Sequence, residues 1–244
     1  MKLKTLEEKL LDNRLAFLAT HRGVISQRDG VLFVESDQPE FKFAILGKEA
    51  KVKSIPSSVN LLKLLPWSEA TPAELRNIGF APIAGVSFMS LDPNHSPWKI
   101  RDDLQITQVQ DAGQMDAFSY VQSRSFNENP ESFARLYPWL KAANQRNLHN
   151  SHQGFYVGTL AEEPVGVVLT LTDGDIAGIY AVATLPSHRK KRISTTIMKR
   201  AVSEALTKGC CTITLQVAQD SPVEEFYRHL GFRRVFSTPM YRRS

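Results

Sequence analysis

The sequence contains little cysteine and no long apolar run. Only two of its 244 residues are cysteines, Cys210 and Cys211, and adjacent cysteines cannot easily bridge each other. This excludes a disulfide-stabilised scaffold and indicates a reducing compartment, so we expect a cytoplasmic protein. No apolar stretch approaches the roughly 18 residues that a membrane span requires. Acidic residues interrupt the apolar positions of the N-terminus, which therefore does not read as a secretory signal. We expect no membrane partner.

Charge is unevenly distributed, although the composition is that of an ordinary globular protein, 42% apolar and 23% charged. The segment from His188 to Ser244 contains twelve Lys and Arg against four Asp and Glu, a net charge of +8, whereas the whole chain carries +5. We therefore expect an anionic partner at the C-terminal quarter, either nucleic acid or a phosphorylated cofactor. Aromatic residues do not interleave with these charges as a base-stacking surface would require, which makes nucleic acid the weaker alternative.

The first hundred residues have the patterns of a helix followed by short strands and turns. The N-terminus predicts an amphipathic helix whose inward positions are Leu6, Leu10, Leu15 and Leu18. Strands are predicted over residues 23–27, 31–36 and 41–46, the first two joined by a turn at 28–30, with further apolar runs at 61–65 and 86–91. The turn-forming residues of segment 92–99 predict a linker.

After this linker, helical and strand patterns alternate more clearly. The prediction is a strand at 104–109, helices at 111–123 and 131–144, strands at 154–160, 165–172 and 176–184, a helix at 193–208, a strand at 212–217, a short helix from 221 and a strand at 235–241. Hairpins followed by strand–helix–strand units imply an α/β (α+β) fold, with a mixed sheet and helices on its faces.

Two short helices share one sequence pattern. The segments TPAELRNIGF (residues 71–80) and SPVEEFYRHLGF (221–232) each begin with a capping box, in which the Glu side chain reaches back to the Ser or Thr backbone N–H. Each ends at a glycine suited to a left-handed turn. We interpret them as an internal repeat, and chance similarity of two helix ends is the alternative. Four residues before the glycine, the C-terminal copy has Tyr227 and the N-terminal copy has Leu75.

The C-terminal half resembles the GNAT superfamily of acetyl-CoA-dependent N-acetyltransferases. The resemblance runs from about Leu104 to Tyr241 and is strongest in AVATLPSHRKKRISTTIMKRAVSEALTKG and LQVAQDSPVEEFYRHLGF. It implies a mixed, mostly antiparallel GNAT sheet flanked by helices. It further implies an acetyltransferase domain at residues 98–244 and a smaller, degenerate GNAT-like domain at residues 1–97.

The resemblance gives the basic loop before the helix at 193–208 a role. In the family this loop has the pattern Q/R-x-x-G-x-G/A, and its backbone N–H groups hold the CoA pyrophosphate together with the helix N-terminus. Here Arg189 matches the first position, whereas Arg192 and Ser194 replace the two small residues. An arginine at the glycine position adds strain of about 1 kcal/mol or more if its φ is positive, and it also adds a charge that can pair with phosphate. A merely solvated basic turn is the alternative.

The resemblance also implies the other site residues. Tyr227 matches the tyrosine that donates a proton to the departing thiolate or contacts the thioester sulfur, and Asp220 stands where many members have asparagine. Backbone groups of the strand before the loop would align with the pantetheine arm and stabilise the oxyanion. The implied CoA-binding residues are Val182, Ala183, Thr184, Arg189, Lys190, Lys191, Arg192, Ile193, Ser194, Thr195 and Asp220. The strand at 176–185 contains no acidic residue, so no general base is assigned.

The resulting prediction is an acetyl-CoA-dependent N-acetyltransferase in which a primary amine attacks the thioester directly, without a metal. The sequence does not identify the acceptor, which can be a small molecule or a peptide, and both a monomer and a homodimer are compatible with it. The alternative is a catalytically inactive GNAT-like binding or regulatory module with a degenerate CoA loop. Arg192 at the glycine position and the missing base motivate this alternative.

Overall fold

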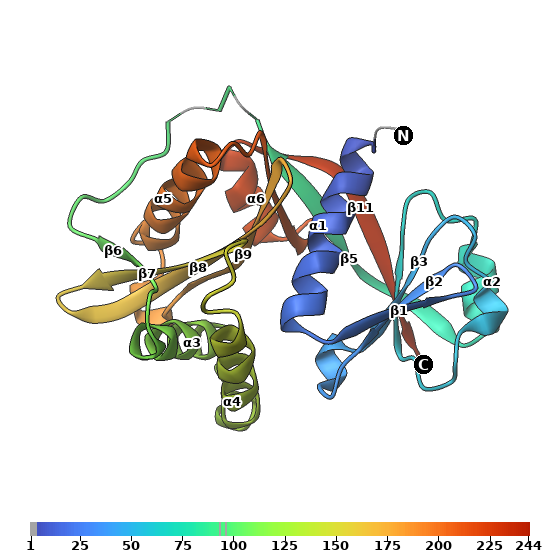
Figure 1. The fold of residues 1–244 in the computed structure, drawn as a ribbon. Helices are drawn as coiled ribbons and strands as arrows, with labels where there is room; N and C mark the ends of the chain where they lie inside the picture. The colour runs from blue at the N-terminus through green and yellow to red at the C-terminus, as the bar shows by residue number, and fades with distance from the viewer. Residues whose placement is uncertain (1–3, 93, 96) are drawn as a thin grey trace. The chain divides into compact units, whose positions relative to one another are not determined.

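The computed structural model describes residues 4–92, 94–95 and 97–244 (Figure 1). The chain divides into two compact units, one formed by Met1–Pro93 with Gln216–Ser244 and the other by Asn94–Leu215. Strand β10 (Thr212–Ala218) contains the point where the chain passes from the second unit to the first. Residues 93 and 96 of the predicted linker lie outside the described residues, and the predicted domain boundary after residue 97 stays a prediction.

The first unit contains helices and a mostly antiparallel set of strands. Its elements are α1 (Leu6–His21), β1 (Val24–Arg28), β2 (Val31–Glu35), β3 (Phe43–Leu46), β4 (Leu61–Leu64), α2 (Pro72–Asn77), β5 (Phe80–Leu91), α6 (Pro222–His229) and β11 (Phe232–Arg243). The strands are ordered β1-β2-β3-β4-β11-β5, and only β3 and β4 pair in parallel. The predicted N-terminal helix and the three strands that follow it are confirmed.

The turn between β1 and β2 consists of Asp29 and Gly30. Arg28 pairs with Val31 across it, and the two turn residues have φ values of 50° and 73°. A two-residue turn of this kind follows the right-handed twist of the flanking strands, and Asp-Gly is a preferred pair for it. The predicted hairpin is confirmed.

Helix α1 buries most of its predicted apolar stripe. Leu10 and Leu18 are fully buried, and Leu15 is half-buried. Leu6 is 40% exposed, so its predicted inward position was wrong. Leu6 is the first helical residue and stands at the edge of the stripe, whose buried centre also includes Leu11.

Strands β5 and β11 pair with each other in an antiparallel register. Phe232, at the start of β11, lies opposite Leu91 at the end of β5, and Phe80, at the start of β5, lies opposite Arg243 at the end of β11. The start of each strand therefore meets the end of the other. The predicted strand at 235–241 extends by several residues at its N-terminal side, because pairing with β5 includes that segment.

The helix ends before these two strands are alike. Gly79 and Gly231 have φ values of 86° and 91°, which confirms the predicted left-handed turns. The carbonyl of Gly79 accepts from the N–H of Ser244 at 2.9 Å, and the carbonyl of Gly231 accepts from the N–H of Asp92 at 3.0 Å. This equivalence supports the internal repeat, which stays a prediction.

Helix α6 departs from the predicted capping box in one detail. The Ser221 side chain accepts from the Glu224 N–H at 3.1 Å, as predicted. The Glu224 carboxylate does not reach back to Ser221, however; it accepts from the N–H of Asp220 at 2.5 Å and from the Arg234 guanidinium at 2.8 Å. The arginine on β11 holds this buried carboxylate, whereas the box of α2 is complete on both sides.

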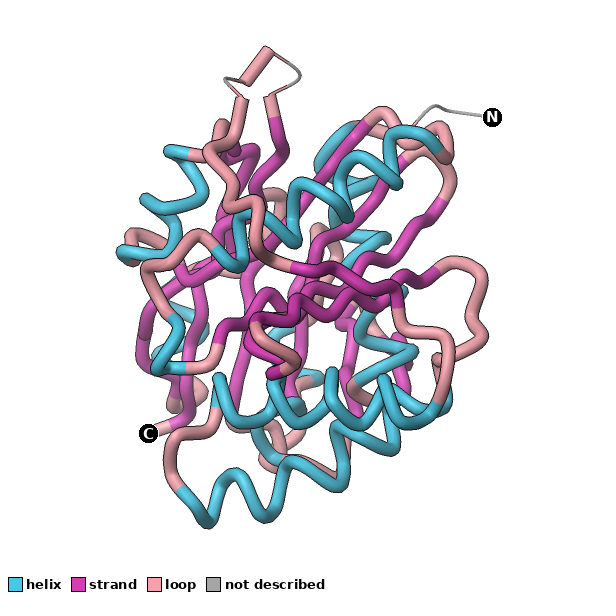
Figure 2. The backbone as a smooth tube through the Cα atoms, turned by 90° about the vertical axis from the view of Figure 1, so that its left-hand side faces the viewer, coloured by secondary structure: helices cyan, strands magenta, loops and turns pink. Residues whose placement is uncertain are grey.

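The second unit is a sheet with helices on both faces. Its elements are β6 (Gln105–Gln108), α3 (Ala112–Phe126), α4 (Pro130–Arg146), β7 (Gln153–Leu160), β8 (Glu163–Asp173), β9 (Ile176–Thr184), α5 (Ile193–Thr207) and the first part of β10. Helix α5 covers one face of β7 to β9, and α3 with α4 covers the other (Figures 1 and 2). The strand order is β6-β7-β8-β9-β10, antiparallel except for β9 with β10. The predicted fold class, a mixed and mostly antiparallel sheet flanked by helices, is confirmed.

The structure describes both cysteines and shows how long and how apolar the helices are. Cys210 is buried and Cys211 is exposed, and both are free thiols. Within the described residues, no helix is both long enough and apolar enough to cross a membrane.

Candidate active site

Strand β9 carries a bulge within the segment predicted to hold the CoA arm. The register between β8 and β9 shifts here, so that Ala181 and Val182 together lie opposite a single residue, Val168. Ala181 has a left-handed φ of 49°. A bulge bends its strand and takes backbone groups out of the ladder, which makes them available to a ligand. Pairing of β9 with β10 covers residues 176–178 and 212–214 only, so it does not reach the bulge.

The Thr184 hydroxyl at the end of β9 is a further polar group that a ligand can contact. Ala183 is buried, and Val182 and Thr184 are half-buried. The Thr184 hydroxyl oxygen is buried and has no hydrogen-bond partner among the described residues. A buried hydroxyl that lacks a partner costs free energy, so this position is suited to a polar ligand atom or an ordered water.

The basic loop adopts a backbone that normally requires glycine. Lys190 and Arg192 have φ values of 63° and 60°, so both lie in the left-handed region. Arg192 is the N-cap of α5, and its side chain makes no capping hydrogen bond. The loop thus keeps the left-handed conformation at the position where the family pattern has its first glycine, at a conformational cost of about 1–2 kcal/mol. Successive turns of this kind direct backbone N–H groups into a concave surface that suits anions.

The start of α5 offers three such donors. The first intrahelical bond runs from the N–H of Thr196 to the carbonyl of Arg192 at 3.0 Å. Among the described residues, the N–H groups of Ile193, Ser194 and Thr195 have no hydrogen-bond acceptor. Unpaired donors and the helix dipole make this end of α5 favourable for a negatively charged group.

A segment before β6 fixes the start of α5. The N–H of Arg101 donates to the Thr196 hydroxyl at 3.1 Å, and its guanidinium donates to the carbonyl of Lys191 at 3.3 Å. Asp103 holds the same guanidinium through two bonds of 2.6 Å. These contacts were not predictable from local sequence patterns, because Arg101 and Thr196 are 95 residues apart.

Close packing against β7 and β8 fixes the position of α5. A Cβ at Gly166 of β8 would lie 2.5 Å from the Cγ2 of Ile193, and one at Gly158 of β7 would lie 2.7 Å from the Cδ1 of Ile197. Both distances are too short for real atoms, so glycine is required for the first turns of α5 to approach these strands. The donors at the helix start are therefore preorganised by packing.

Arg189 ties the loop to the end of α3. Its guanidinium donates to the Glu128 carboxylate at 2.9 Å and to the carbonyl of Ser125 at 3.0 Å. Lys190, Lys191 and Arg192 are exposed, and the Lys191 ammonium donates to the carbonyl of Ser187 at 3.1 Å. The loop therefore keeps exposed positive charge beside the unpaired N–H groups.

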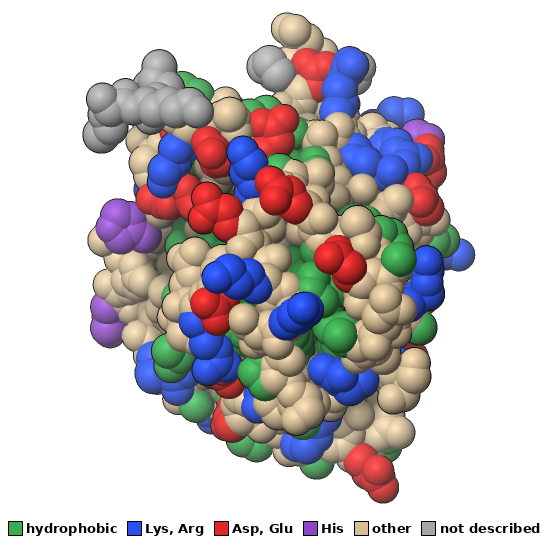
Figure 3. Space-filling model, turned by 90° about the vertical axis from the view of Figure 1, so that its right-hand side faces the viewer, with side chains coloured by type: hydrophobic (Ala, Val, Ile, Leu, Met, Phe, Trp, Pro, Cys, Tyr) green, Lys and Arg blue, Asp and Glu red, His purple; other side chains and the backbone are tan. Residues whose placement is uncertain are grey.

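Four of the eight other Lys and Arg residues of the C-terminal segment form ion pairs with carboxylates. Ion pairs join Arg200 to Glu204, Arg228 to Glu225, Arg233 to Asp92 and Arg234 to Asp220 and Glu224. Figure 3 shows a different face, on the side of β1, β2, β3 and α2 in Figure 1, on which Lys and Arg side chains are also interspersed with Asp and Glu. These ion pairs neutralise the four arginines, whereas the loop residues Lys190, Lys191 and Arg192 keep exposed positive charge.

Tyr227 belongs to the first unit, on α6. It is 7% exposed and packs edge-on against Phe232, with ring centroids 5.8 Å apart. Burial raises the pKa of the Tyr227 phenol above its ordinary value. The phenol is therefore protonated at neutral pH, which is the state that a proton donor needs.

Asp220, which precedes α6, is engaged within the first unit. Its carboxylate pairs with Arg234 at 2.6 Å and accepts from Gln219 at 3.1 Å, and its φ is 54°. The hydrogen bond from Arg234 lowers the pKa of Asp220, so the carboxylate is ionised at neutral pH. Because this charge is already paired, Asp220 acts first on the geometry of the turn before α6.

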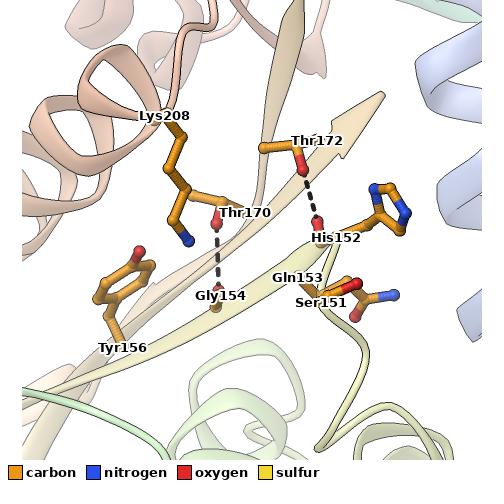
Figure 4. Close-up of a pocket in the computed structure, with 9 residues that line it drawn as sticks. Ser151, His152, Gln153, Gly154, Tyr156, Thr170, Thr172 and Lys208 are labelled. Atoms are coloured by element: carbon orange, nitrogen blue, oxygen red, sulfur yellow. Dashed lines mark hydrogen bonds between the residues drawn. The ribbon is translucent and has the colours of Figure 1, made fainter. Parts of the chain in front are cut away.

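Two hollows in the second unit differ in size. A small polar pocket between α5, β7 and β8 is lined by side chains that include Tyr156, Thr170 and Lys208 (Figure 4). Its volume of about 10 Å³ holds no more than a water, so it is too small for a substrate. An open groove of about 350 Å³ lies along α3, α4 and the start of β8, beside Tyr120 and Tyr137.

The chain is similar to one known protein family and to several solved structures. The acetyltransferase (GNAT) family matches residues 116–232. No curated protein matches the chain. Similar solved structures include a GCN5-related N-acetyltransferase from Kribbella flavida, which is 12% identical with a TM-score of 0.71 over 99% of this chain and 96% of that one.

Two further structures share the fold. A functionally unknown conserved protein from Staphylococcus epidermidis is 10% identical with a TM-score of 0.63, over 89% of this chain and 92% of that one. A GNAT-family acetyltransferase from Colwellia psychrerythraea is 12% identical with a TM-score of 0.58, over 78% and 67%. At these identities the structures show the fold alone, and the family match carries the assignment. The segment of residues 116–232 therefore belongs to the acetyltransferase (GNAT) family, which is a family of acyltransferases.

Proposed function

We propose that the chain transfers the acetyl group of acetyl-CoA to a primary amine of a small molecule or a peptide. The observation that carries this proposal is the start of α5, where the N–H groups of Ile193, Ser194 and Thr195 lack acceptors beside the left-handed Arg192. A diphosphate fits this donor set, because it is anionic and accepts several hydrogen bonds at once.

The residues of the loop and of β9 would divide the binding of acetyl-CoA between them. Residues 189–195 would hold the pyrophosphate, with Lys190 and Arg192 adding charge from exposed side chains. The backbone of Val182, Ala183 and Thr184 would align with the pantetheine arm. Asp220 would contribute mainly by shaping the turn before α6.

The chemistry needs an oxyanion donor and an acid. The amine attacks the thioester carbonyl, and a backbone N–H freed by the bulge at Ala181 and Val182 would donate to the oxygen as negative charge develops. The C–S bond then breaks, and Tyr227 would donate its phenolic proton to the thiolate. No side chain is assigned as the base that removes the ammonium proton, and ordered water would take this role. The free thiols of Cys210 and Cys211 support a reducing compartment such as the cytoplasm.

Amine-dependent release of free CoA thiol tests the proposal directly. The purified protein would be incubated with acetyl-CoA and a panel of small amines and lysine peptides, with Arg192→Gly in parallel. Glycine accepts the left-handed φ without strain, so this variant should be more stable and should still bind acetyl-CoA. Thiol release with at least one amine supports transfer. Binding of acetyl-CoA without turnover on any amine would favour the regulatory alternative.

A further inference from the structure

Lys63 stands in an apolar surrounding within the first unit. It is the lysine of Leu-Leu-Lys-Leu-Leu, residues 61–65, and β4 directs the fully buried Leu62 to the opposite face of the strand. The Lys63 side chain lines a cavity between α1 and the strands. The other lining residues are Leu11, Arg14, Leu18, Phe43, Ile45, Leu65, Val86, Phe88 and Thr238.

The surroundings of the Lys63 amine disfavour its charged form. Its Nζ lies 4.1 Å from the centroid of the Phe43 ring, a contact that favours the ammonium, but no carboxylate pairs with it among the described residues. Burial, together with the positive charge of Arg14, lowers the pKa of Lys63 to about 7. Arg14 on α1 is the charged group that faces it across the cavity. A large share of Lys63 is therefore the uncharged, nucleophilic amine at neutral pH.

The cavity selects by size and polarity. Its volume of about 20 Å³ holds one or two molecules of the size of water, which excludes nucleotides, thioesters and most metabolites. Its lining is largely apolar, which admits a small uncharged molecule more readily than an ion. Carbon dioxide satisfies both conditions, and it is an electrophile for a free amine.

We propose that Lys63 is a carbamylation site for dissolved carbon dioxide. The Nζ lone pair forms a bond to the carbon of carbon dioxide, one C–O π pair moves onto oxygen, and Nζ loses a proton to water. The product is a carbamate anion in place of a neutral amine. Arg14 supplies the facing positive charge, and the Thr238 hydroxyl, which bonds the Val86 carbonyl only weakly at 3.4 Å, supplies a polar group beside it.

Nuclear magnetic resonance with ¹³C-labelled bicarbonate tests this proposal on the full chain. Wild type should show a protein-bound carbamate resonance that strengthens as pH rises through about 7, because the free amine is the reacting form. Lys63→Met should remove the resonance, and Arg14→Met should weaken it severalfold. Lys48→Met, which removes an exposed lysine of the same unit, should leave it unchanged.

A second measurement locates the site without a variant. Alkyloxonium trapping of the carbamate in wild type, followed by peptide mass spectrometry, should place the added group on Lys63. The proposal is overturned if the trapped group lies on other lysines or if wild type shows no carbamate resonance. It is also overturned if no covalent adduct forms and chloride stabilises the protein against heat as much as bicarbonate does. That result would mean that the cavity holds a simple anion.

Discussion

The guanidinium of Arg189 contacts the Glu128 carboxylate at 2.9 Å, and the same guanidinium holds the last turn of α3 through the carbonyl of Ser125. One side chain therefore connects the basic loop before α5 to the end of α3, on the opposite face of the sheet. Glu128 also neutralises a charge that a pyrophosphate would otherwise meet. The ion pair between Arg189 and Glu128 therefore has two effects. It holds the loop in place, and its carboxylate competes with a pyrophosphate for the arginine.

Glu128→Gln should strengthen acetyl-CoA binding by about two- to fivefold, because it removes a carboxylate that competes for Arg189. The pair is exposed, so unfolding free energy should change by less than about 1 kcal/mol. Glu131→Gln, an equal change of charge at the start of α4, is the control and should leave the affinity unchanged. Weaker binding by Glu128→Gln would mean that the brace matters more than the free charge.

Gly166→Ala should destabilise the protein by about 1–3 kcal/mol and weaken acetyl-CoA binding. The new Cβ would lie 2.5 Å from Ile193, so the first turn of α5 has to move away from the sheet together with its N–H donors. Gly113→Ala in α3 is the matched control, because its Cβ would lie 3.4 Å from the Oδ1 of Asp111, an ordinary van der Waals distance. Unchanged affinity in Gly166→Ala would show that this contact does not position the site.

Tyr227→Phe should lower kcat by about 100-fold and leave the Kd for acetyl-CoA unchanged, because it removes only the phenolic proton. Burial raises the pKa of Tyr227, so the protonated donor persists as pH rises through the ordinary tyrosine value near 10. The pH profile of kcat in wild type should therefore show no loss of this acid up to that pH. A Tyr227→Phe enzyme with full kcat would remove the residue from the chemistry.

Arg234→Leu should cost about 3 kcal/mol of stability, because it removes the closest cationic partner of the fully buried Glu224 carboxylate and leaves only the Arg228 guanidinium, at 3.3 Å. Arg233→Leu is the control: that side chain is 80% exposed in its pair with Asp92, so its loss should cost less than about 1 kcal/mol. Chemical denaturation of both variants measures the difference. Equal effects would contradict the special role of the buried pair.

The same pair has a pH signature. Burial alone would raise the pKa of Glu224, but hydrogen bonds from Arg234 and the Asp220 N–H outweigh it, and the pKa lies below its ordinary value. A lowered folded pKa gives stability that is present above the unfolded pKa, about 4.3, and is lost as pH falls through the folded value. Wild type should lose this stability on acidification, and Arg234→Leu should lose less of it.

Local patterns predicted the elements well, and contacts between distant residues were not predictable from them. Gly231 and the Asp29-Gly30 turn were predictable because their dihedrals depend on a few neighbouring residues. The bulge at Ala181 depends on how β8 and β9 align, and the pairing of Arg189 with Glu128 joins segments 61 residues apart. Lys63 could not be singled out from the sequence, because it lies in an apolar run and its surroundings depend on how α1 packs.

The sequence pattern predicted where the basic loop lies, but it did not predict which backbone conformation Arg192 adopts. Arginine at the position of the family's first glycine left open whether the backbone keeps its left-handed turn. The structure places Arg192 at a φ of 60°, in the left-handed region that a glycine adopts without strain. Packing of Ile193 and Ile197 on two glycines and the Arg101 brace hold this backbone, and both arise from residues far away in sequence.

We propose that the start of α5 binds the pyrophosphate of acetyl-CoA. Calorimetric titration of wild type, Ser194→Asp and Ser203→Asp with acetyl-CoA is the measurement that bears on this proposal without an acceptor amine. Each variant adds one negative charge to α5, the first among the N–H donors and the second near the other end. An acid in the first turn favours the helix, so Ser194→Asp should fold at least as well as wild type. We expect micromolar binding by wild type and Ser203→Asp, with binding by Ser194→Asp weakened about tenfold or more. Equal affinities in all three proteins, or no binding by wild type, would contradict it.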